Sequence, residues 1–458
     1  MSRPATLALS RRLVLSGLAA LPAAAALPRR VRAEAHGGAE VLALSMADLH
    51  SPYARLPQVL AEIDRIGAET GLPMIFIING DTFERGNVAA LRSGGSVDLA
   101  FWDALVRRGP TILNLGNHET ALVDDMATAV AQAEGLGLHV VGNLIDNRRG
   151  RFFAPYATSI TAGGHRIGAL GLAATNPFVY REPVRQTLQF LDPAAFAAET
   201  FGAVVEGNDM SLMLSHAGVA DDKAILPTLP EGVAMIGAHD HLSFVDESMP
   251  VPYVHGGSWA GALTVIGLAP GAHPTVEMRP IGVEMDADGA LAEMIAATLA
   301  EHLTPEETAV IGTTNVARDL PASILFAAEA VRAAAGADIA MLGHTTFGQP
   351  LPQGEVTRYD FDAYIRFDGD IQMVELSGAD LTAIMGRANQ HLATSLDQRS
   401  GDFVHAAQID IDPEASYRLA VNGWTAINQG AYLGREDLEF SAVEGLHLKQ
   451  VVADALAG

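Results

Sequence analysis

The sequence predicts a layered α/β domain followed by a smaller second domain. Apolar runs typical of buried strands alternate with segments whose apolar residues have helical spacing. Several of these runs end in side chains that can bind metal, and an α/β fold binds its ligands outside the carboxyl ends of its strands. A helical segment at 290–303 then leads into Thr304-Pro305-Glu306-Glu307, an N-cap-like signal and a candidate linker between the domains.

The composition limits what the chain can be. Its 458 residues suffice for two or three domains, and 49% hydrophobic with 18% charged residues is globular composition. The chain has no cysteine, which excludes disulfides, thiolate zinc sites and cysteine nucleophiles, so a metal must be held by His, Asn and carboxylates. The net charge of -25 argues against a nucleic-acid polymer or an anionic membrane as partner.

Residues 1–35 are predicted to be a twin-arginine signal peptide. The run Ser10-Arg11-Arg12-Leu13-Val14-Leu15 has the twin-arginine pattern, an apolar stretch follows at 15–27, and Ala33-Glu34-Ala35 is a small-residue end. The apolar stretch is too short to span a bilayer, although an uncleaved N-terminal anchor is the alternative. We therefore expect a periplasmic or secreted protein without membrane association after cleavage.

The predicted elements follow one another in a regular order. In the first domain we expect strands at 41–46, 74–78, 111–115 and 139–141, a hairpin at 156–173, further strands at 210–214, 233–236, 253–265 and 275–283, and helices at 56–66, 99–106 and 126–133. In the second we expect a helix at 324–335, strands at 338–342, 371–376 and 416–421, and a glycine-bounded loop at 343–348.

Five strand ends in the first domain carry side chains suited to a two-ion site. A lone buried His is more often a core residue than a ligand, but five such ends in one domain are hard to obtain by chance. Asp81 is the natural bridging carboxylate, and neutral nitrogen and oxygen donors would complete each sphere. The strand ends deliver Asp48 and His50, Asp81, Asn117 and His118, His216, and His239 and His241.

These residues stand in ordered motifs that resemble the calcineurin-like metallophosphoesterases. The motifs are Asp48-x-His50, Gly80-Asp81, Gly116-Asn117-His118-Glu119, His216 and Gly237-x-His239-x-His241. The two-part layout resembles the bacterial 5′-nucleotidase family, with support from Ala337-Asp338-Ile339-Ala340, Leu351-Pro352-x-Gly354-Glu355-Val356-Thr357 and Val374-Glu375-Leu376-Ser377-Gly378. The resemblance implies a four-layer α/β/β/α sandwich at 40–285, a linker helix at 286–310 and a smaller α+β 5′-nucleotidase-type domain at 311–458.

The resemblance also implies roles for the strand-end residues. One divalent ion, Mn or Zn, would be held by Asp48, His50, Asp81 and His241, and a second by Asp81, Asn117, His216 and His239. Two such ions lower the pKa of a bound water and neutralise phosphoryl oxygens during in-line attack. His118 would stabilise charge in the transition state or protonate the leaving oxygen.

Two departures from the family pattern bear on activity and substrate. The family usually continues after Glu119 with an aromatic residue and an Asp that orients the catalytic His, whereas this chain has Thr120-Ala121. Either Asp124 or Asp125 substitutes, or His118 acts without a carboxylate partner. The loop at 343–348 also lacks the usual substrate-binding Arg. The remaining candidates for substrate contacts are the aromatic residues Phe347, Phe403 and Trp424 and the cations Arg358 and Arg366.

The expected function is that of an exported dinuclear phosphohydrolase. Its substrates would be small phosphomonoesters such as nucleoside 5′-phosphates, with cyclic nucleotides and nucleotide sugars as further candidates. A sulfur-anion hydrolase resembling the thiosulfohydrolases is an alternative within the same fold. A non-catalytic periplasmic protein that binds metal or an anion is an alternative of another class.

Overall fold

The computed structural model describes residues 38–458. The predicted signal peptide lies outside these residues. Within the described part of the chain, no helix is both long enough and apolar enough to cross a membrane.

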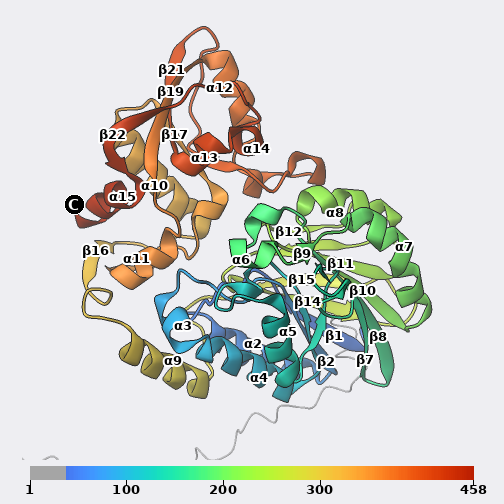
Figure 1. The fold of residues 1–458 in the computed structure, drawn as a ribbon. Coiled ribbons are helices and arrows are strands. Elements are labelled where there is room, and N and C mark those ends of the chain that lie inside the picture. Colours follow the sequence, from blue (N-terminus) through green and yellow to red (C-terminus); the bar gives the residue numbers. More distant parts are fainter. Residues whose placement is uncertain (1–37) are drawn as a thin grey trace, which may run out of the picture.

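The first domain contains two six-stranded sheets (Figure 1). The first sheet has the order β15-β14-β1-β2-β3-β4, and β1 to β4 are parallel. Its strands are β1 (Val41–Met46), β2 (Met74–Asn79), β3 (Thr111–Asn114), β4 (His139–Val141), β14 (Ala262–Leu268) and β15 (Thr275–Pro280). Because β1, β2 and β3 are covered on both faces, each is mainly apolar and buried along its length and does not alternate between apolar and polar residues.

The second sheet has the order β12-β13-β11-β10-β8-β7, with β8, β10, β11 and β13 parallel. Its strands are β7 (Ala157–Ala162), β8 (His165–Ala173), β10 (Met210–His216), β11 (Val233–Gly237), β12 (Ser243–Asp246) and β13 (Tyr253–Gly256). The predicted hairpin at 156–173 is confirmed, since β7 and β8 pair antiparallel around Gly163 and Gly164. A separate small sheet consists of β5 (Ile145–Asp146), β6 (Arg151–Phe152) and β9 (Leu188–Gln189).

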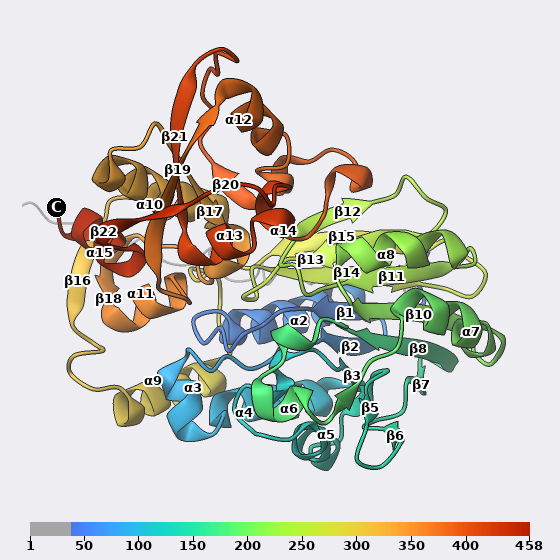
Figure 2. The same ribbon diagram turned by 45° about the horizontal axis from the view of Figure 1, so that its top comes forward.

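The two large sheets face one another across an aliphatic core and carry helices on their outer faces (Figure 2). The predicted four-layer α/β/β/α sandwich is therefore confirmed. The first sheet is covered by α2 (Leu56–Thr70), α3 (Val88–Ser93), α4 (Ser96–Arg108), α5 (Met126–Gly135) and α9 (Gly289–His302), and the second by α7 (Pro193–Glu206) and α8 (Val219–Ile225). A short helix, α6 (Glu182–Arg185), lies in the connection between β8 and β9.

Two buried asparagines join the carboxyl ends of the two sheets. The Asn79 side-chain amide donates to the carbonyls of Ser215 and Ile236 in the second sheet, at 3.1 and 2.9 Å. The Asn114 amide donates to Asn79 Oδ1 at 2.8 Å and to the Leu172 carbonyl at 2.9 Å. Buried polar groups of this kind require partners, so these bonds fix how the strand ends of one sheet meet those of the other.

The second domain is built on a five-stranded sheet of order β20-β17-β21-β19-β22. Its strands are β17 (Ile339–Gly343), β19 (Asp370–Ser377), β20 (Val404–Ala406), β21 (Ser416–Asn422) and β22 (Ser441–His447), and a two-stranded sheet pairs β16 (Val310–Thr314) with β18 (Gly354–Thr357). One face packs on α10 (Leu320–Ala335), α11 (Arg358–Tyr364) and α15 (Leu448–Ala457). The other packs on α12 (Gly378–Met385) and α14 (Gln429–Leu433), with α13 (Gly423–Ile427) beside them.

Two sequence-based expectations were wrong in detail. The predicted strand at 253–265 is two strands in different sheets, because Trp259 and Ala260 have positive φ angles of 55° and 51° and turn the chain between them. No helix begins at Thr304, whose carbonyl instead accepts from Glu307 N in a turn. The preceding helix α9 packs its Leu291 and Ile295 into the core of the first domain, so it serves as a layer of that domain.

Candidate metal centre

Seven of the eight strand-end residues of the first domain meet in one place, and Asn117 directly precedes one of them, His118. They follow β1, β2 and β3 of the first sheet and β10 and β11 of the second, whose parallel strands bring these ends together. Three groups have ligand atoms within 4.8 Å of one another: Asp48 with His50 and His241, Asp81 with His216 and His239, and His50 with Asp81 and His118. The structure therefore brings together residues that lie up to 193 positions apart, His241 minus Asp48, in the sequence.

The backbone at this place is unusual. Nine non-glycine residues in the described part of the chain have positive φ angles, and five of them are among the eight: Asp48, His50, Asp81, His239 and His241. Such conformations cost about 1–3 kcal/mol each and persist where function requires them. The concentration of strain at the strand ends supports a functional role for the cluster.

Each of the central side chains is held in a defined orientation. His216 Nδ1 donates to the Asn79 carbonyl at 2.8 Å, which leaves Nε2 3.3 Å from Asp81 Oδ1. Asp81 Oδ1 also accepts from His118 N at 2.6 Å, and both Asp48 oxygens accept from His239 N at 3.1 and 3.0 Å. The outer hydrogen bonds thus point the remaining donor atoms towards a common centre.

The electrostatics of the cluster favour a bound cation. Burial raises the pKa of Asp48, because a carboxylate there has lost its solvation. Burial also lowers the pKa of His50 to about 4 and that of His239 to about 3, so both imidazoles are neutral electron-pair donors at pH 7. Burial opposes charge on His216, yet the adjoining carboxylates Asp81 and Asp48 raise its pKa. The carboxylates Asp81 and Asp48 therefore stabilise positive charge beside them, at His216.

Several buried donor atoms have no hydrogen-bond partner, and their chemistry fits divalent metal ions. They are Asn117 Oδ1, His216 Nε2, His239 Nδ1 and His241 Nδ1. Buried polar atoms are normally paired, so several unpaired ones on residues of one cluster indicate ligands. Imidazole, amide and carboxylate donors suit Mn, Zn or Fe.

His118 lies at the edge of the cluster and is partly exposed. Its side chain is 23% exposed, and its ring meets the ring of His50 edge-on at 4.6 Å between centroids. Asp124 pairs with Arg181 at 2.8 Å, and Asp125 caps α5 and pairs with Arg148 at 2.7 Å. Both carboxylates are engaged elsewhere, so neither of these expected substitutes orients His118.

The weaker candidates for substrate contacts are dispersed. Phe347 and Phe403 are fully buried, Phe347 in the core of the second domain and Phe403 stacked on His344, so neither ring offers a face to a ligand. Trp424 is 53% exposed and lines a cavity. Arg358 packs over Phe361, at 5.6 Å from the ring centroid.

Arg366 lies closer to the cluster than the sequence indicated. Its guanidinium donates to Glu84 Oε2 at 2.6 Å, and Glu84 lies beside His50 and His118. Trp259 stacks on His50 with ring centroids 5.5 Å apart. Sequence reasoning missed Glu84 and Trp259, although Glu84 follows Asp81 by only three residues in the same loop.

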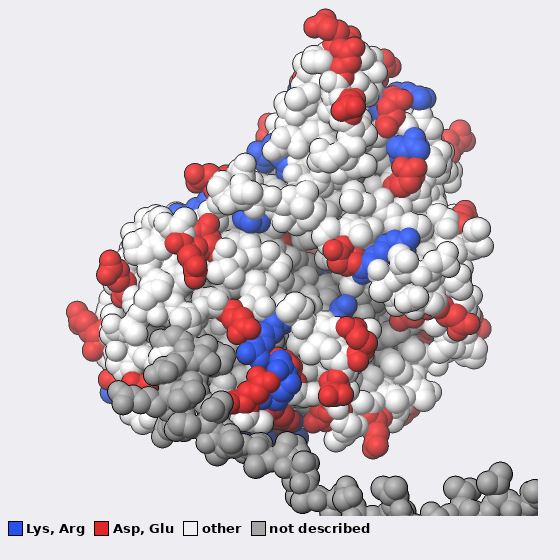
Figure 3. Space-filling view, turned by 180° about the vertical axis from the view of Figure 1, so that it is seen from behind, with Lys and Arg blue, Asp and Glu red and all other residues white. Residues whose placement is uncertain are grey.

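The surface charge agrees with a small substrate. Figure 3 shows acidic side chains scattered over one face, with the fewer basic side chains in small groups beside them. Binding of a nucleic-acid polymer requires clustered Lys and Arg. The face shown lacks a continuous basic surface among its described residues.

Comparisons with known proteins agree with this architecture. A sequence model of the calcineurin-like phosphoesterases matches residues 43–242, and one of the 5′-nucleotidase C-terminal domain matches residues 306–435. The uncharacterized metallophosphoesterase YunD of Bacillus subtilis (strain 168) is 26% identical over 205 residues, which are 42% of this chain and 42% of that protein.

Two solved structures are similar along nearly the whole chain. The 5′-nucleotidase precursor of Thermus thermophilus has a TM-score of 0.59 and 18% identity, covering 91% of this chain and 96% of that one. The sulfate thiohydrolase SoxB of the same genus has a TM-score of 0.62 and 15% identity, covering 91% and 94%. At such identities the likeness shows the fold.

The domain matches and the clustered His and Asp residues define a metal-dependent phosphoesterase. More particularly, the chain carries a calcineurin-like phosphoesterase domain at residues 43–242 and a 5′-nucleotidase C-terminal domain at residues 306–435.

Proposed function

We propose that the protein is a dinuclear phosphohydrolase that cleaves small phosphomonoesters such as nucleoside 5′-phosphates. The observation that carries the proposal is the pair of triads, Asp48 with His50 and His241, and Asp81 with His216 and His239, whose donor atoms lie within 4.8 Å. Asn117 would contribute to the second ligand set, and Asp81 would be available to both.

The residues at the proposed metal centre have different roles in the proposed reaction. Two divalent ions in this position would supply a nucleophile at neutral pH and neutralise charge on the phosphoryl group. His118 is partly exposed and faces the cluster, so it is placed to hold a proton near the leaving oxygen. The ring of Trp259 stacks on His50 and would shield that side of the metal centre from water.

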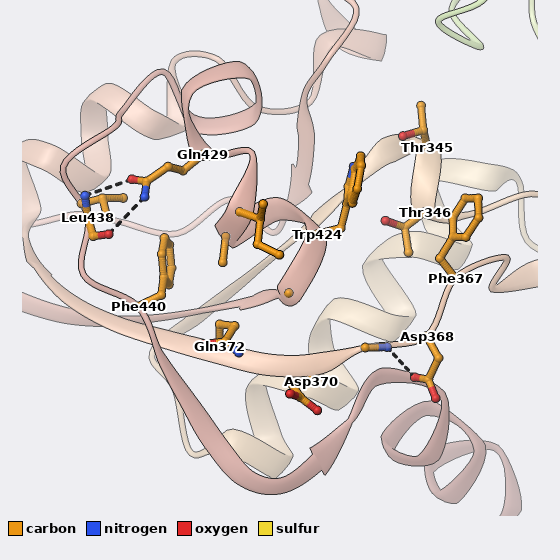
Figure 4. Close-up of a pocket in the computed structure, with 14 residues that line it drawn as sticks. Thr345, Thr346, Phe367, Asp368, Asp370, Gln372, Trp424, Gln429, Leu438 and Phe440 are labelled. Atoms are coloured by element: carbon orange, nitrogen blue, oxygen red, sulfur yellow. Dashed lines mark hydrogen bonds between the residues drawn. The ribbon is translucent and has the colours of Figure 1, made fainter. Parts of the chain in front are cut away.

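The leaving group would lie in a cavity of the second domain (Figure 4). The cavity has a volume of about 760 Å³ and is lined by Phe367, Trp424, Ile427 and Phe440 among others. None of the proposed metal ligands lines it, but Phe367 directly follows Arg366, which contacts Glu84 beside the metal centre. Exposed aromatic rings such as Trp424 suit stacking with a planar base.

The test is phosphate release by the protein loaded with Mn or Zn. The substrates are AMP, UMP, a nucleotide sugar, a 2′,3′-cyclic nucleotide and an aryl phosphate, with Asp81→Asn as the blank. We expect AMP and UMP turnover well above that of the aryl phosphate, and a loss of at least about 10³-fold in Asp81→Asn because both ions share Asp81. The Trp424→Ala variant should raise KM for nucleotides about 10-fold while the aryl phosphate is unaffected.

The control for Trp424→Ala is Leu392→Ala, which removes an exposed apolar side chain outside the cavity. Turnover of the aryl phosphate alone would remove the nucleotidase proposal and retain phosphatase chemistry. No turnover that depends on Asp81 would contradict the phosphohydrolase itself and favour a protein that only binds metal or an anion.

A sulfur-anion hydrolase is the second candidate. The similarity to SoxB, with a TM-score of 0.62, and the absence of Arg from the loop at 343–348 favour it. Turnover of a sulfonated carrier peptide, with none of the nucleotides cleaved, would establish this candidate in place of the first.

We further propose that the protein is exported to the periplasm or secreted through the twin-arginine route. The proposal rests on the run at 10–15 and the apolar stretch at 15–27. Replacement of Arg11 and Arg12 by Lys should leave the protein in the cytoplasm, as measured by fractionation. Unchanged export of that variant would contradict the proposal.

A further inference from the structure

One carboxylate oxygen lies beside two histidines of the metal centre. Glu84 Oε2 lies 3.5 Å from His50 Nδ1 and 3.9 Å from His118 Nδ1. Both ring nitrogens are buried and have no hydrogen-bond partner, so Glu84 Oε2 approaches them at the distance of an ion pair. Glu84 itself is buried, with 6% of its surface exposed.

The position of this carboxylate is fixed from its own loop. Glu84 Oε1 accepts from Gly86 N at 2.9 Å, and Glu84 N donates to Ser51 Oγ at 3.1 Å. The loop of Asp81 is thereby tied to the residue that directly follows His50. The remaining oxygen, Oε2, is directed at the two imidazoles.

The same oxygen is also held from the second domain. Arg366 donates to it at 2.6 Å, and the Arg366 side chain is only 6% exposed. The guanidinium lies 5.8 Å from the ring of Trp259, which stacks on His50. Arg366 N donates to the Thr346 carbonyl at 3.0 Å, so the side chain extends from a fixed backbone. A buried charge left without its partner is strongly unfavourable, so Arg366 and Glu84 each depend on the other at this place.

The two ring nitrogens of His50 have separate roles in this arrangement. Nε2 faces Asp81 Oδ2 at 3.8 Å on the side of the metal ligands, which leaves Nδ1 for Glu84. Metal-binding histidines usually give their second ring N–H to a carboxylate, which fixes the tautomer and the ring orientation. Oε2 accepts a hydrogen bond from Arg366 and lies 3.5 Å from His50 Nδ1 and 3.9 Å from His118 Nδ1, so it is nearer to His50 than to His118.

We infer that Glu84 is the positioning residue for His50 and His118, and that Arg366 of the second domain holds Glu84 in place. The carboxylate takes the place of the orienting Asp that the motif at 116–119 lacks. The metal centre is then complete only when the second domain is in contact with the first. The part of this inference that concerns His118 rests on the proposed function, whereas the part that concerns His50 rests on metal binding alone.

Metal affinity provides the first test and needs no substrate. We expect Glu84→Gln to bind Mn or Zn about 10-fold or more weakly than the wild type, as measured by competition with a chelator. The Glu84→Asp variant should recover part of the affinity, and Arg366→Lys should fall between the wild type and Glu84→Gln. Tyr359→Phe is the matched control, because Tyr359 donates to Asn87 Oδ1 at 3.1 Å across the same domain interface.

The second test separates proton transfer from binding. With metal at saturation, Glu84→Gln should lower kcat for an alkyl phosphomonoester about 10-fold more than kcat for an aryl phosphate, with KM unchanged. The reason is that an alkoxide leaving group needs a proton from a correctly oriented His118 and an aryl oxide does not. A purely structural ion pair would lower both rates alike.

The outcomes distinguish the inference from the proposed function. Metal affinity equal in the wild type, Glu84→Gln and Tyr359→Phe would overturn the inference for His50, and equal rate ratios would overturn it for His118. If the wild type hydrolyses none of the phosphate esters, the proposed function fails while the metal affinities still decide the role of Glu84. Should Glu84→Gln fail to fold, Glu84→Asp and Arg366→Lys carry the same comparison.

Discussion

At the scale of single residues, the molecule tolerates buried charge where a second group compensates for it. Glu84 shows this, because burial raises its pKa but Arg366, His50 and His118 together hold the pKa well below its usual range. Asp98 shows the opposite case. It is buried at the start of α4, accepts one hydrogen bond from the Tyr53 hydroxyl at 3.0 Å and faces no cation in contact.

Asp98→Asn should therefore gain stability relative to the wild type as pH rises. Burial raises the pKa of Asp98 to about 7, so the folded protein keeps its proton at pH values where the unfolded chain has lost it. The stabilisation from this protonation is present below pH 3.8 and is lost as pH rises through about 7. Between pH 5 and pH 8 the unfolding free energy of the variant should improve against the wild type by about 1 kcal/mol or more, since one pKa unit is worth about 1.4 kcal/mol.

Parallel urea titrations at the two pH values measure this difference. Asp64→Asn, at an exposed position of the same domain, is the control and should show little pH dependence. If the unfolding free energies of Asp98→Asn and the wild type differ by the same amount at both pH values, the pKa of Asp98 is not raised.

At the scale of elements, the loops at the strand ends can lie close to one another because glycines occupy the points of contact. A Cβ on Gly80, which has a φ of +81°, would lie 2.2 Å from His216 Nδ1. A Cβ on Gly116 would lie 2.3 Å from Asp81 Oδ1. Side chains at these two positions would separate the loops that carry the metal ligands.

Gly116→Ala should accordingly weaken metal binding without unfolding the protein. The new methyl group must displace the Asp81 carboxylate, and such overpacking costs about 1–3 kcal/mol. Metal content after dialysis measures the loss of metal binding, and a thermal scan shows whether the variant is still folded. Gly135→Ala is the control, because a Cβ there meets no atom within 4 Å. Full metal content in Gly116→Ala would show that the loop adjusts.

The sequence predicted the elements that carry the ligands better than the contacts between domains. The strands at 41–46 and 139–141 were predicted with the bounds that the structure has, because each is a short, mainly apolar run. Asp48 and His50 were visible because they follow the first of these strands closely. Glu84 was missed because its partner Arg366 is 282 residues away. The turn at Trp259 was missed because an aromatic residue with positive φ has no local sequence signal.

At the scale of the whole molecule, the proposed metal ligands come from both sheets of the first domain, and the second domain contacts that domain beside them. Arg366 contacts Glu84, Lys223 donates to the Arg399 carbonyl at 2.7 Å, and the Arg399 guanidinium lies 4.0 Å from the ring centroid of Phe244. Ligation should therefore stabilise the sandwich as a unit, since ions that bind only the folded state shift its equilibrium.

Removal of metal should lower the thermal unfolding temperature of the wild type but leave Asp81→Asn unchanged. At ion concentrations 100-fold above Kd, binding contributes about 2.7 kcal/mol, which a chelator would abolish. Differential scanning calorimetry with and without the chelator measures the shift. A wild-type unfolding temperature that does not respond to the chelator would mean that the cluster holds no ion under those conditions.

The division of the chain has a consequence for how such proteins can diversify. The proposed ligands all lie between residues 48 and 241, whereas the cavity that we propose for the leaving group is lined by residues of the segment 345–440. Substitutions in the later segment can change which compound is accepted while the reactive centre is inherited intact, provided that Arg366 is kept. After gene duplication, copies of this protein could thus acquire new substrates through selection on the later segment alone.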